Sequence, residues 1–319
     1  MKAVFRSQYG SHDVIQIGEM PVPTIKPDEA LVKVSVTTVN RTDQGVITGL
    51  PYIFRFFTGL GKPKHSILGT DFAGEIVEVG ANYSAYKVGD KVWGFNDHSW
   101  PTQAELTIIN KNISTALIPS YITDKQVVAS AEAFHYAINF INKVNLKPGK
   151  KAFVFGATGA IGSAMIQILK YNGLYVVASC KAAYFDKIKP LGADKLFDYE
   201  TEKISEITEK FDYFFDAVGK SDFKTSKLIL NPVGIYISTE LGPGNENLYL
   251  PILTMWSKQK VIFPFPSNIP ESMLLALKMI SENAFSPLID REYRIDEAQN
   301  AYRYMMSGQK IGNVILKIG

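Results

Sequence analysis

The residues of this sequence best suited to chemistry form a glycine-rich turn, Gly156-Ala157-Thr158-Gly159-Ala160-Ile161-Gly162. The turn follows an apolar stretch and precedes a segment with helical spacing. Glycines permit a tight turn and let backbone N–H groups approach an anion, and a helix N-terminus adds partial positive charge. The spacing G-x-x-G-x-x-G departs from the usual G-x-G-x-x-G, and a turn needed only for packing is the alternative. Its context nevertheless predicts a pyrophosphate site. The candidate contacts are Thr158, Gly159, Ala160 and Ile161.

The residues that follow the next expected strand bear on the choice of cofactor. A site for NAD usually places an acidic residue about 20 residues beyond the turn, where it holds the ribose hydroxyls. No acidic residue occurs between positions 174 and 184, whereas Ser179 and Lys181 offer a hydroxyl and a cation. These groups suit a 2′-phosphate, which an acid would repel. The sequence therefore predicts NADPH, although Lys181 could also be a plain surface lysine.

Two kinds of periodicity define the elements that must position these residues. In the first third, residues 30–39, 71–79 and 91–95 alternate as half-buried strands do, with Gly and Asp turns between them. From residue 124 the period becomes helical, and short strands then alternate with helices, which is typical of βαβ units and a parallel sheet. The expected strands are 151–155, 174–178, 195–197, 211–216, 233–238 and 261–263. The expected helices are 124–144, 162–172, 185–191 and 272–283, and residues 311–318 return to a strand pattern.

Length and composition limit the classes of protein. The chain has 319 residues, enough for about two domains. Its 34 basic and 31 acidic residues are too evenly balanced to favour nucleic acid or a membrane surface as a partner. One cysteine, Cys180, allows neither an intrachain disulfide nor a cysteine-based zinc site. The N-terminus lacks the apolar run of a signal peptide, and no apolar stretch is long enough to span a bilayer. We therefore expect a cytoplasmic protein.

Several short motifs occur in a fixed order along nearly the whole chain. They are residues 39–43 (VNRTD), 67–74 (ILGTDFAG), 87–92 (KVGDKV), 191–194 (LGAD), 215–219 (FDAVG) and 308–313 (GQKIGN). With the glycine turn, they resemble the medium-chain dehydrogenase/reductase superfamily, in its zinc-free quinone oxidoreductase branch. The resemblance implies an α/β fold in which a Rossmann doubly wound parallel sheet is inserted into a GroES-like β-barrel catalytic domain. It implies a catalytic domain at residues 1–120, completed by 284–319, and an NADPH-binding domain at 121–283.

The resemblance also shows where metal ligands are missing. Zinc alcohol dehydrogenases of the superfamily carry a catalytic Cys and a Gly-His-Glu, where this chain has Asn40 and Gly69-Thr70-Asp71. An amide and a hydroxyl are poor zinc ligands compared with thiolate and imidazole. The histidines, His12, His65, His98 and His135, are too scattered to suggest a replacement. We therefore expect no metal.

Chemistry without zinc must be less demanding. Hydride can add to the β-carbon of an α,β-unsaturated carbonyl or to a quinone, and hydrogen bonds then stabilise the oxyanion. The resemblance implies that Asn40 and Asp43 lie near the nicotinamide, where Asn40 could donate through its amide. Asp43 would position that amide or bond the ribose. Gly45 replaces a tyrosine common in the family, and Tyr52, in the aromatic segment 50–57, is a candidate for lining the substrate mouth or for simple packing.

The resemblance implies further cofactor contacts. Tyr199 would lie near the adenosine phosphate and Val218 near the adenine ribose. Ser238 and Thr239 would approach the nicotinamide, and Asn313 would make a C-terminal contact. The alternatives are a surface aromatic for Tyr199 and a turn residue for Asn313.

These observations favour a zinc-independent, NADPH-dependent reductase of a small quinone, enone or enoyl compound. The alternative is a redox sensor or binding protein that holds NADPH with little turnover. Residues 261–263 form an apolar strand at the expected sheet edge, and proteins of the superfamily dimerise by joining such edges. We therefore also expect a homodimer.

Overall fold

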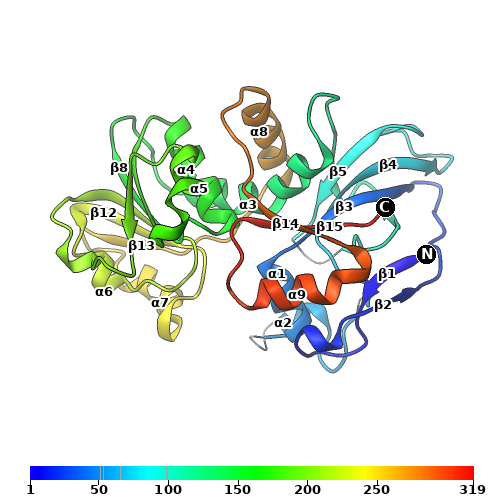
Figure 1. Ribbon diagram of the computed structural model, residues 1–319, viewed down its shortest axis with the longest axis horizontal. Coiled ribbons are helices and arrows are strands. Elements are labelled where there is room, and N and C mark those ends of the chain that lie inside the picture. The colour runs from blue at the N-terminus through cyan, green and yellow to red at the C-terminus, as the bar shows by residue number, and fades with distance from the viewer. Residues whose placement is uncertain (51, 53, 65, 98–99) are drawn as a thin grey trace. The chain divides into compact units, whose positions relative to one another are not determined.

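The computed structural model describes residues 1–50, 52, 54–64, 66–97 and 100–319. It divides into two compact units. The first unit is Met1–Glu132 with Ile269–Lys278 and Ile289–Gly319, and the second is Ala133–Asn268 with Met279–Leu288 (Figure 1). These bounds differ from the expected divisions at 120/121 and 283/284, because helices α3 (Asp124–Ile141) and α8 (Ile269–Ser281) each run across a division.

The first unit is built on a largely antiparallel sheet with the strand order β14-β15-β3-β4-β5-β7. Its strands are β3 (Ala30–Val39), β4 (Asp71–Val79), β5 (Lys91–Phe95), β7 (Ser114–Leu117), β14 (Ile289–Arg294) and β15 (Asn313–Lys317), and β6 (Leu106–Ile109) also pairs with β3. A separate hairpin joins β1 (Lys2–Phe5) to β2 (Gln16–Glu19). The strands expected at 30–39, 71–79 and 91–95 are confirmed. β1, β2, β6, β7 and β14 were not predicted, because short strands carry too little alternation to stand out.

The C-terminal tail completes the sheet of the first unit. β15 pairs antiparallel with β3, with Val314 opposite Val39, which confirms the strand expected near residues 311–318. Helix α9 (Ala298–Met306) packs on the same core through Ala298, Ala301, Tyr302 and Met305. This spacing of three and four residues puts the apolar side chains on one helix face. The tail therefore belongs physically to the unit that the N-terminal strands begin.

The second unit is built on a six-stranded parallel sheet with the order β10-β9-β8-β11-β12-β13. Its strands are β8 (Lys151–Phe155), β9 (Tyr175–Cys180), β10 (Lys195–Asp198), β11 (Phe211–Asp216), β12 (Leu230–Ser238) and β13 (Lys260–Ile262). The strand order reverses at β8, so right-handed crossovers place α4 (Ala160–Tyr171) and α5 (Phe185–Ile188) on one face and α6 (Phe223–Ser226) and α7 (Glu246–Leu253) on the other. Such a reversal creates a ligand-binding crevice at the carboxyl ends of the central strands.

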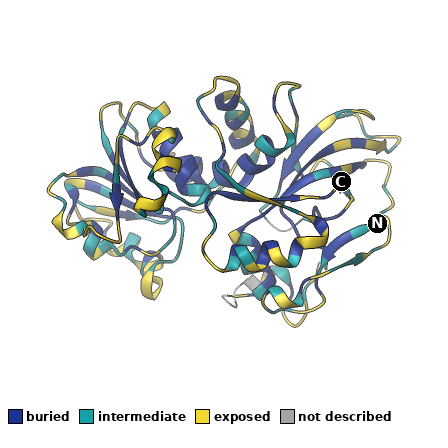
Figure 2. Ribbon diagram, viewed as in Figure 1, coloured by how far each residue is buried: buried dark blue, intermediate teal, exposed yellow. Residues whose placement is uncertain are grey.

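Aromatic side chains fill the core of the second unit. Phe153 on β8 stacks on Phe214 of β11, with ring centroids 5.1 Å apart, and meets Phe197 and Phe211 edge to face at 5.6 and 5.4 Å. Figure 2 shows the strands of this sheet as buried, with exposed residues on the outer faces of the helices. Burial on both faces explains why these strands read as apolar runs rather than as alternating patterns.

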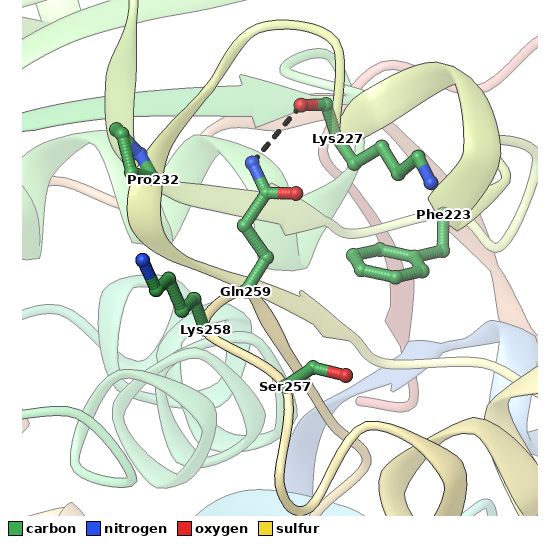
Figure 3. A pocket seen from close by; sticks show the side chains of 6 residues that line it. All are labelled: Phe223, Lys227, Pro232, Ser257, Lys258 and Gln259. Atoms are coloured by element: carbon green, nitrogen blue, oxygen red, sulfur yellow. Dashed lines mark hydrogen bonds between the residues drawn. The ribbon is translucent and has the colours of Figure 1, made fainter.

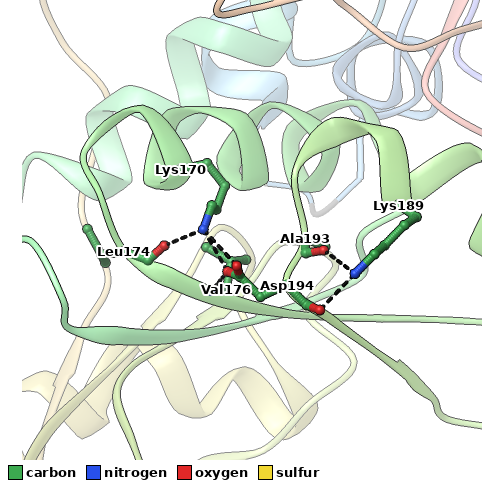
Figure 4. A network of polar contacts seen from close by, with 6 residues as sticks. All are labelled: Lys170, Leu174, Val176, Lys189, Ala193 and Asp194. Carbon is green, nitrogen blue, oxygen red and sulfur yellow. Dashed lines mark hydrogen bonds and ion pairs between the residues drawn. The ribbon is translucent and has the colours of Figure 1, made fainter.

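The LGAD motif has a structural role in this unit (Figure 4). The Lys170 ammonium, at the end of α4, donates to both carboxylate oxygens of Asp194 at 2.9 and 2.7 Å and to the Leu174 carbonyl at 2.9 Å. The Asp194 carboxylate also accepts from the Val176 backbone N–H at 2.7 Å. Partial burial raises the pKa of Asp194, but the hydrogen bonds from Lys170 and Val176 outweigh it and the pKa is lowered. Asp194 of the motif thus connects the end of α4 to the start of β9 through hydrogen bonds.

Candidate functional site

The glycine turn is drawn tightly against the end of β8. Gly156 has a φ of +87°, a conformation that favours glycine. A Cβ on Gly162 would lie 2.2 Å from the Gly156 carbonyl oxygen, so the helix cannot pack this closely with any larger residue there. α4 begins directly after Gly159, and the first N–H groups of a helix have no partner within it. The turn and the start of α4 therefore place backbone donors where an anion such as a pyrophosphate can bind.

Other predicted cofactor residues lie at the same carboxyl ends of the parallel strands. A Cβ on Gly156 would lie 2.6 Å from Cγ1 of Val218, so the glycine turn and the segment after β11 are in close contact. Ser179, at the end of β9, is buried, and its hydroxyl has no hydrogen-bond partner among the residues that the structure describes. An orphaned hydroxyl costs free energy unless a ligand completes it. These features fit a dinucleotide at this edge.

Lys181 and Tyr199 lie at the outer part of this edge. The Lys181 ammonium forms an ion pair with Glu200, with 2.6 Å between nitrogen and oxygen, and the two side chains are 42% and 51% exposed. Tyr199 follows β10 and lies next to Phe155; burial raises the pKa of its hydroxyl, and the nearby Lys181 cation lowers it in part. The sequence did not indicate that Glu200, in the turn after β10, would reach Lys181. An exposed pair of this kind is weak and exchanges easily for another anion.

Asp216, at the end of β11, organises the segment that follows it. Its carboxylate accepts the backbone N–H groups of Val218 at 3.0 Å, Gly219 at 2.8 Å and Ser221 at 3.0 Å. Its backbone oxygen accepts from the Thr239 N–H at 3.0 Å, which joins the end of β12 to that of β11. Ser238 is buried, and its hydroxyl donates to the Glu240 carbonyl at 3.0 Å. The FDAVG motif contained this residue, but its role as an acceptor for three amides was not predicted.

In the first unit, Asn40 and Asp71 form a buried polar cluster with the end of β3. Asn40 caps helix α1 (Arg41–Thr48), and its amide donates to Thr38 Oγ1 at 2.5 Å and to Asp71 Oδ2 at 3.3 Å. The Asp71 carboxylate also accepts from the Thr37 hydroxyl at 3.0 Å, from the Thr38 N–H at 2.8 Å and from the Thr38 hydroxyl. Burial raises the pKa of Asp71 to about 6, against these donors. Both amide hydrogens of Asn40 are thus engaged within the unit.

Asp43 holds the backbone of Asn40. Its Oδ2 accepts the Asn40 backbone N–H at 2.8 Å, so the bond holds the backbone of Asn40, and the expected role in positioning the side-chain amide stays a prediction. Burial raises the pKa of Asp43 to about 7, with the Asn40 hydrogen bond lowering it and the nearby Asp71 raising it. The Tyr302 hydroxyl donates its hydrogen to Gln103 Oε1 at 2.9 Å and lies close enough to Asp43 to lower the pKa of that carboxyl slightly. A bond from Asp43 to a ribose stays a prediction.

Sequence reasoning missed several members of this cluster. Glu132 of α3 contacts Thr42, and Lys310, Arg6 and Tyr302 carry charge or hydroxyl groups close to Asp43. Arg6 is 2% exposed, and its Nε and Nη1 have no acceptor among the described residues, although its guanidinium lies 5.0 Å from the Tyr9 ring centroid. Lys310 lies in the GQKIGN motif, but Arg6, Glu132 and Tyr302 lie in none of the motifs, so the sequence alone did not group these residues.

Tyr52 is largely exposed, whereas Asn313 directly precedes Val314, which pairs with Val39 next to Asn40. Tyr52 is 69% exposed, and its ring lies 4.8 Å from the Arg55 guanidinium rather than in the buried cluster. The short helix α2 (Phe54–Thr58) follows it, and Pro51 and Ile53 of the same segment lie outside the described residues. Asn313 is buried at the start of β15 in the first unit. Their proposed contacts with substrate and cofactor stay predictions.

A cavity of about 380 Å³ in the second unit has a different position. It is lined by Phe223, Lys227, Pro232, Ser257, Lys258 and Gln259 (Figure 3). Gln259 directly precedes β13 and Pro232 lies near the start of β12, so the cavity is at the amino ends of these strands. The glycine turn lies at the carboxyl ends, on the opposite edge of a parallel sheet. The cavity is therefore separate from the candidate cofactor site.

The comparisons with known proteins agree on the class. Residues 26–111 match the family model of the alcohol dehydrogenase GroES-like domain, and residues 191–316 match one described as a zinc-binding dehydrogenase. A quinone-oxidoreductase homolog from Spinacia oleracea is 27% identical and covers 99% of this chain and 98% of its own length. An NADPH-dependent alkenal/one oxidoreductase from Arabidopsis thaliana is 30% identical over 72% of this chain and 60% of its own. The structure of the quinone oxidoreductase from Coxiella burnetii aligns over 100% of this chain and 99% of its own, with a TM-score of 0.88 and 23% identity.

A GroES-like unit and a Rossmann-like parallel sheet, each carrying part of the predicted site, define the class of two-domain dehydrogenases and reductases. The chain belongs to the medium-chain dehydrogenase/reductase superfamily and is quinone-oxidoreductase-like within it. The predicted fold class and family are therefore confirmed. None of the helices in the described ranges is long and apolar enough to cross a membrane.

The residues present do not fit the zinc that one family description names. Asn40 and Asp71, which the resemblance sets opposite the Cys and the Gly-His-Glu of zinc-dependent members, are each already held by hydrogen bonds to their own neighbours. Zinc prefers thiolate and imidazole, and Thr70 offers only a hydroxyl. Within the described ranges, no three His, Cys, Asp or Glu side chains are grouped so as to hold a metal. His12 and His135 belong to different units, and His65 and His98 lie outside the described residues.

Proposed function

We propose that this protein is a zinc-independent oxidoreductase that transfers hydride from NADPH to a quinone or an α,β-unsaturated carbonyl compound. The observation that carries the proposal is the buried Asn40–Thr38–Asp71 cluster, which offers hydrogen-bond donors and acceptors but neither thiolate nor imidazole. A site with hydrogen-bond donors in place of a Lewis acid suits acceptors that are already activated. The relatives named for quinone and alkenal/one reduction support the same acceptors.

The chain's own residues would bind the cofactor and stabilise charge. NADPH, when bound, supplies the hydride. The glycine turn and the first amides of α4 suit its pyrophosphate, and Ser179 offers an unsatisfied hydroxyl. Asn40 would turn one amide hydrogen from Thr38 or Asp71 toward the developing oxyanion, while Asp43 keeps its backbone in place. Burial strengthens such hydrogen bonds because the local dielectric constant is low.

Incubation of the purified protein with NADPH and a panel of quinones and enones tests the proposal through the loss of absorbance at 340 nm. We expect turnover by a protein in which metal analysis finds less than one zinc per ten chains. Asn40→Ala should lower kcat by roughly 100-fold or more, the usual loss when an oxyanion donor is removed. Tight NADPH binding without turnover would instead favour a redox sensor or binding protein. A requirement for stoichiometric zinc in turnover would contradict the proposal that the reaction is zinc-independent.

The Lys181–Glu200 pair should decide between NADPH and NADH. Lys181→Gln should raise the KM for NADPH roughly 10-fold or more and leave that for NADH unchanged, because a charged hydrogen bond to the 2′-phosphate is lost. Glu200→Gln should lower the KM for NADPH, since Lys181 no longer exchanges one anion for another. Steady-state kinetics with both cofactors checks this. Equal changes for the two cofactors in Lys181→Gln would contradict the NADPH assignment.

We also propose a homodimer joined through the outer edge of the second unit. β13 is the last strand of the parallel sheet, and α7 packs beside it. The neighbouring apolar residues Leu248, Ile252, Leu253, Met255 and Trp256 are each more than half exposed. A patch of this kind is normally covered by a partner. Light scattering should show a dimer at micromolar concentration, a monomer for Ile252→Glu/Trp256→Glu, and still a dimer for Leu274→Glu, an exposed residue on α8. A monomeric parent protein would refute the proposal.

The cytoplasm stays the predicted location. The thiol of Cys180 is buried, and burial raises its pKa to about 11, which suits a protein that keeps its thiol reduced. Relatives from Spinacia oleracea and Arabidopsis thaliana are named as chloroplastic, however. Fractionation of native cells with an antibody to this chain would decide between the compartments.

A further inference from the structure

The side chain of Glu132 is buried next to the first turn of α1, with one carboxyl oxygen bonded and the other not. Its Oε1 lies 2.8 Å from the Thr42 hydroxyl. Its Oε2 has no hydrogen-bond partner among the residues that the structure describes, and the side chain is 7% exposed. Thr42 lies between Asn40 and Asp43 and is partly exposed. A buried acid is thus connected through one hydroxyl to the turn that carries the proposed oxyanion donor.

Charged groups face this acid from several elements. Asp43 on α1 and Asp71 on β4 bring negative charge, and Lys310, before β15, brings an ammonium that donates to the Gly312 carbonyl at 3.1 Å. Burial and the charge of Arg41 lower the pKa of Lys310, whereas Asp290 raises it. The Arg6 guanidinium lies close enough to Asp43 for their charges to interact. His135 is buried one turn further along α3. Burial raises the pKa of all three carboxyl groups, and the charge of a neighbouring carboxylate raises those of Glu132 and Asp43 further, so the group with the fewest donors retains a proton most readily.

The hydrogen bonds indicate which carboxyl group retains it. Asp71 accepts from four donors, and Asp43 accepts from the Asn40 N–H and has its pKa lowered slightly by Tyr302. Glu132 has only the Thr42 hydroxyl, which can equally accept. Burial, followed by the charge of Asp43, raises the pKa of Glu132 to about 8, above those of the other two. The order of these pKa values follows the number of donors, and the proton belongs on Glu132.

We propose that Glu132 stores the proton that completes the reduction and passes it through the Thr42 hydroxyl, while Lys310 stabilises the carboxylate that remains. The inference rests on the proposed function. Hydride addition to the β-carbon of an enone moves the C=C electron pair to give an enolate. The Thr42 O–H then gives its proton to the α-carbon, and the Glu132 O–H replaces it on Thr42. Water later returns a proton to Glu132, so the cycle consumes one NADPH and one proton.

The kinetic test uses the full-length protein with NADPH and 3-penten-2-one, whose α-carbon must be protonated. The wild type should lose kcat above about pH 8, and Glu132→Gln should lose roughly 100-fold in kcat at pH 7 with little change in KM. Thr42→Val should lose as much, and the double variant no more. Lys310→Met should move the alkaline limb to higher pH, because the carboxylate loses its cation; a merely structural role would not shift it. Glu75→Gln, an exposed acid on β4, is the control and should behave as the wild type.

A stability titration without cofactor or substrate tests the stored proton separately. Unfolded Glu132 loses its proton near pH 4.5 and folded Glu132 only near pH 8, so the wild type should lose stability across this range relative to Glu132→Gln. The difference in Tm should grow by roughly 5 °C, and Glu75→Gln should show none. A flat difference, or full kcat in Glu132→Gln, overturns the inference. A wild type that reduces no acceptor overturns the proposed function instead, and with it the donor role, whatever the titration shows.

Discussion

Replacing Asp71 with alanine should cost about 3–5 kcal/mol of folding free energy, among the largest losses expected from one substitution in this chain. The carboxylate accepts from two threonine hydroxyls, one backbone N–H and the amide of Asn40, all of them buried. Alanine leaves these donors without a partner in a place that water does not reach. Denaturant unfolding at pH 7 measures the loss, and kcat should fall as well, because Asn40 is no longer oriented.

Asp71→Asn provides the matched control. The amide keeps the shape and one acceptor oxygen, so its cost should be about half that of alanine or less. Asparagine also has no ionisable group, whereas the pKa of Asp71 is about 6 in the folded protein and 3.8 in the unfolded chain. The wild type should therefore lose stability relative to Asp71→Asn as the pH rises from about 4 to 6. An Asp71→Ala protein within 1 kcal/mol of the wild type would show that the cluster contributes little.

Local patterns were sufficient to predict the frame of both units. The strands at 30–39, 71–79, 91–95, 151–155 and 211–216 begin and end where alternation or apolar runs predict. The glycine turn lies between a buried strand and a helix because backbone geometry there depends on glycine and little else. By contrast, the sequence patterns do not predict α7, which contains Pro251, or α9, which lies beyond the helix predicted at residues 272–283.

The residues of the candidate site likewise fall into those that local patterns predict and those that depend on tertiary contacts. The residues at the carboxyl ends of parallel strands, such as Ser179 and Val218, gather because strand order alone brings those ends together. The cluster around Glu132 depends on contacts between positions 42, 132 and 310, which no local pattern connects. The pairing of Lys181 with Glu200 likewise needs the register of β9 and β10. The sequence predicts which charged groups are present, and the tertiary fold determines which partner each of them pairs with.

Gly162→Ala should weaken cofactor binding strongly, although it adds only one methyl group. The new Cβ would lie 2.2 Å from the Gly156 carbonyl oxygen, which is backbone and cannot move aside as a flexible side chain would. α4 must then shift away from the turn, and the N–H groups at its start lose their positions. Overpacking of this kind costs about 1–3 kcal/mol of stability. We expect the Kd for NADPH to rise at least about 10-fold.

Gly159→Ala is the control that shows whether the turn tolerates an added methyl group where it causes no clash. A Cβ there would lie 3.5 Å from the same carbonyl oxygen, an ordinary contact, and Gly159 has a φ of −71° that alanine adopts freely. Its Tm should stay within about 2 °C of the wild type, whereas Gly162→Ala should fall by roughly 3–8 °C. Calorimetric titration with NADPH, with thermal unfolding beside it, checks both variants. Equal Tm and Kd in Gly162→Ala and the parent protein would mean that α4 does not need its close approach to Gly156, and that the turn does not hold the pyrophosphate through these amides.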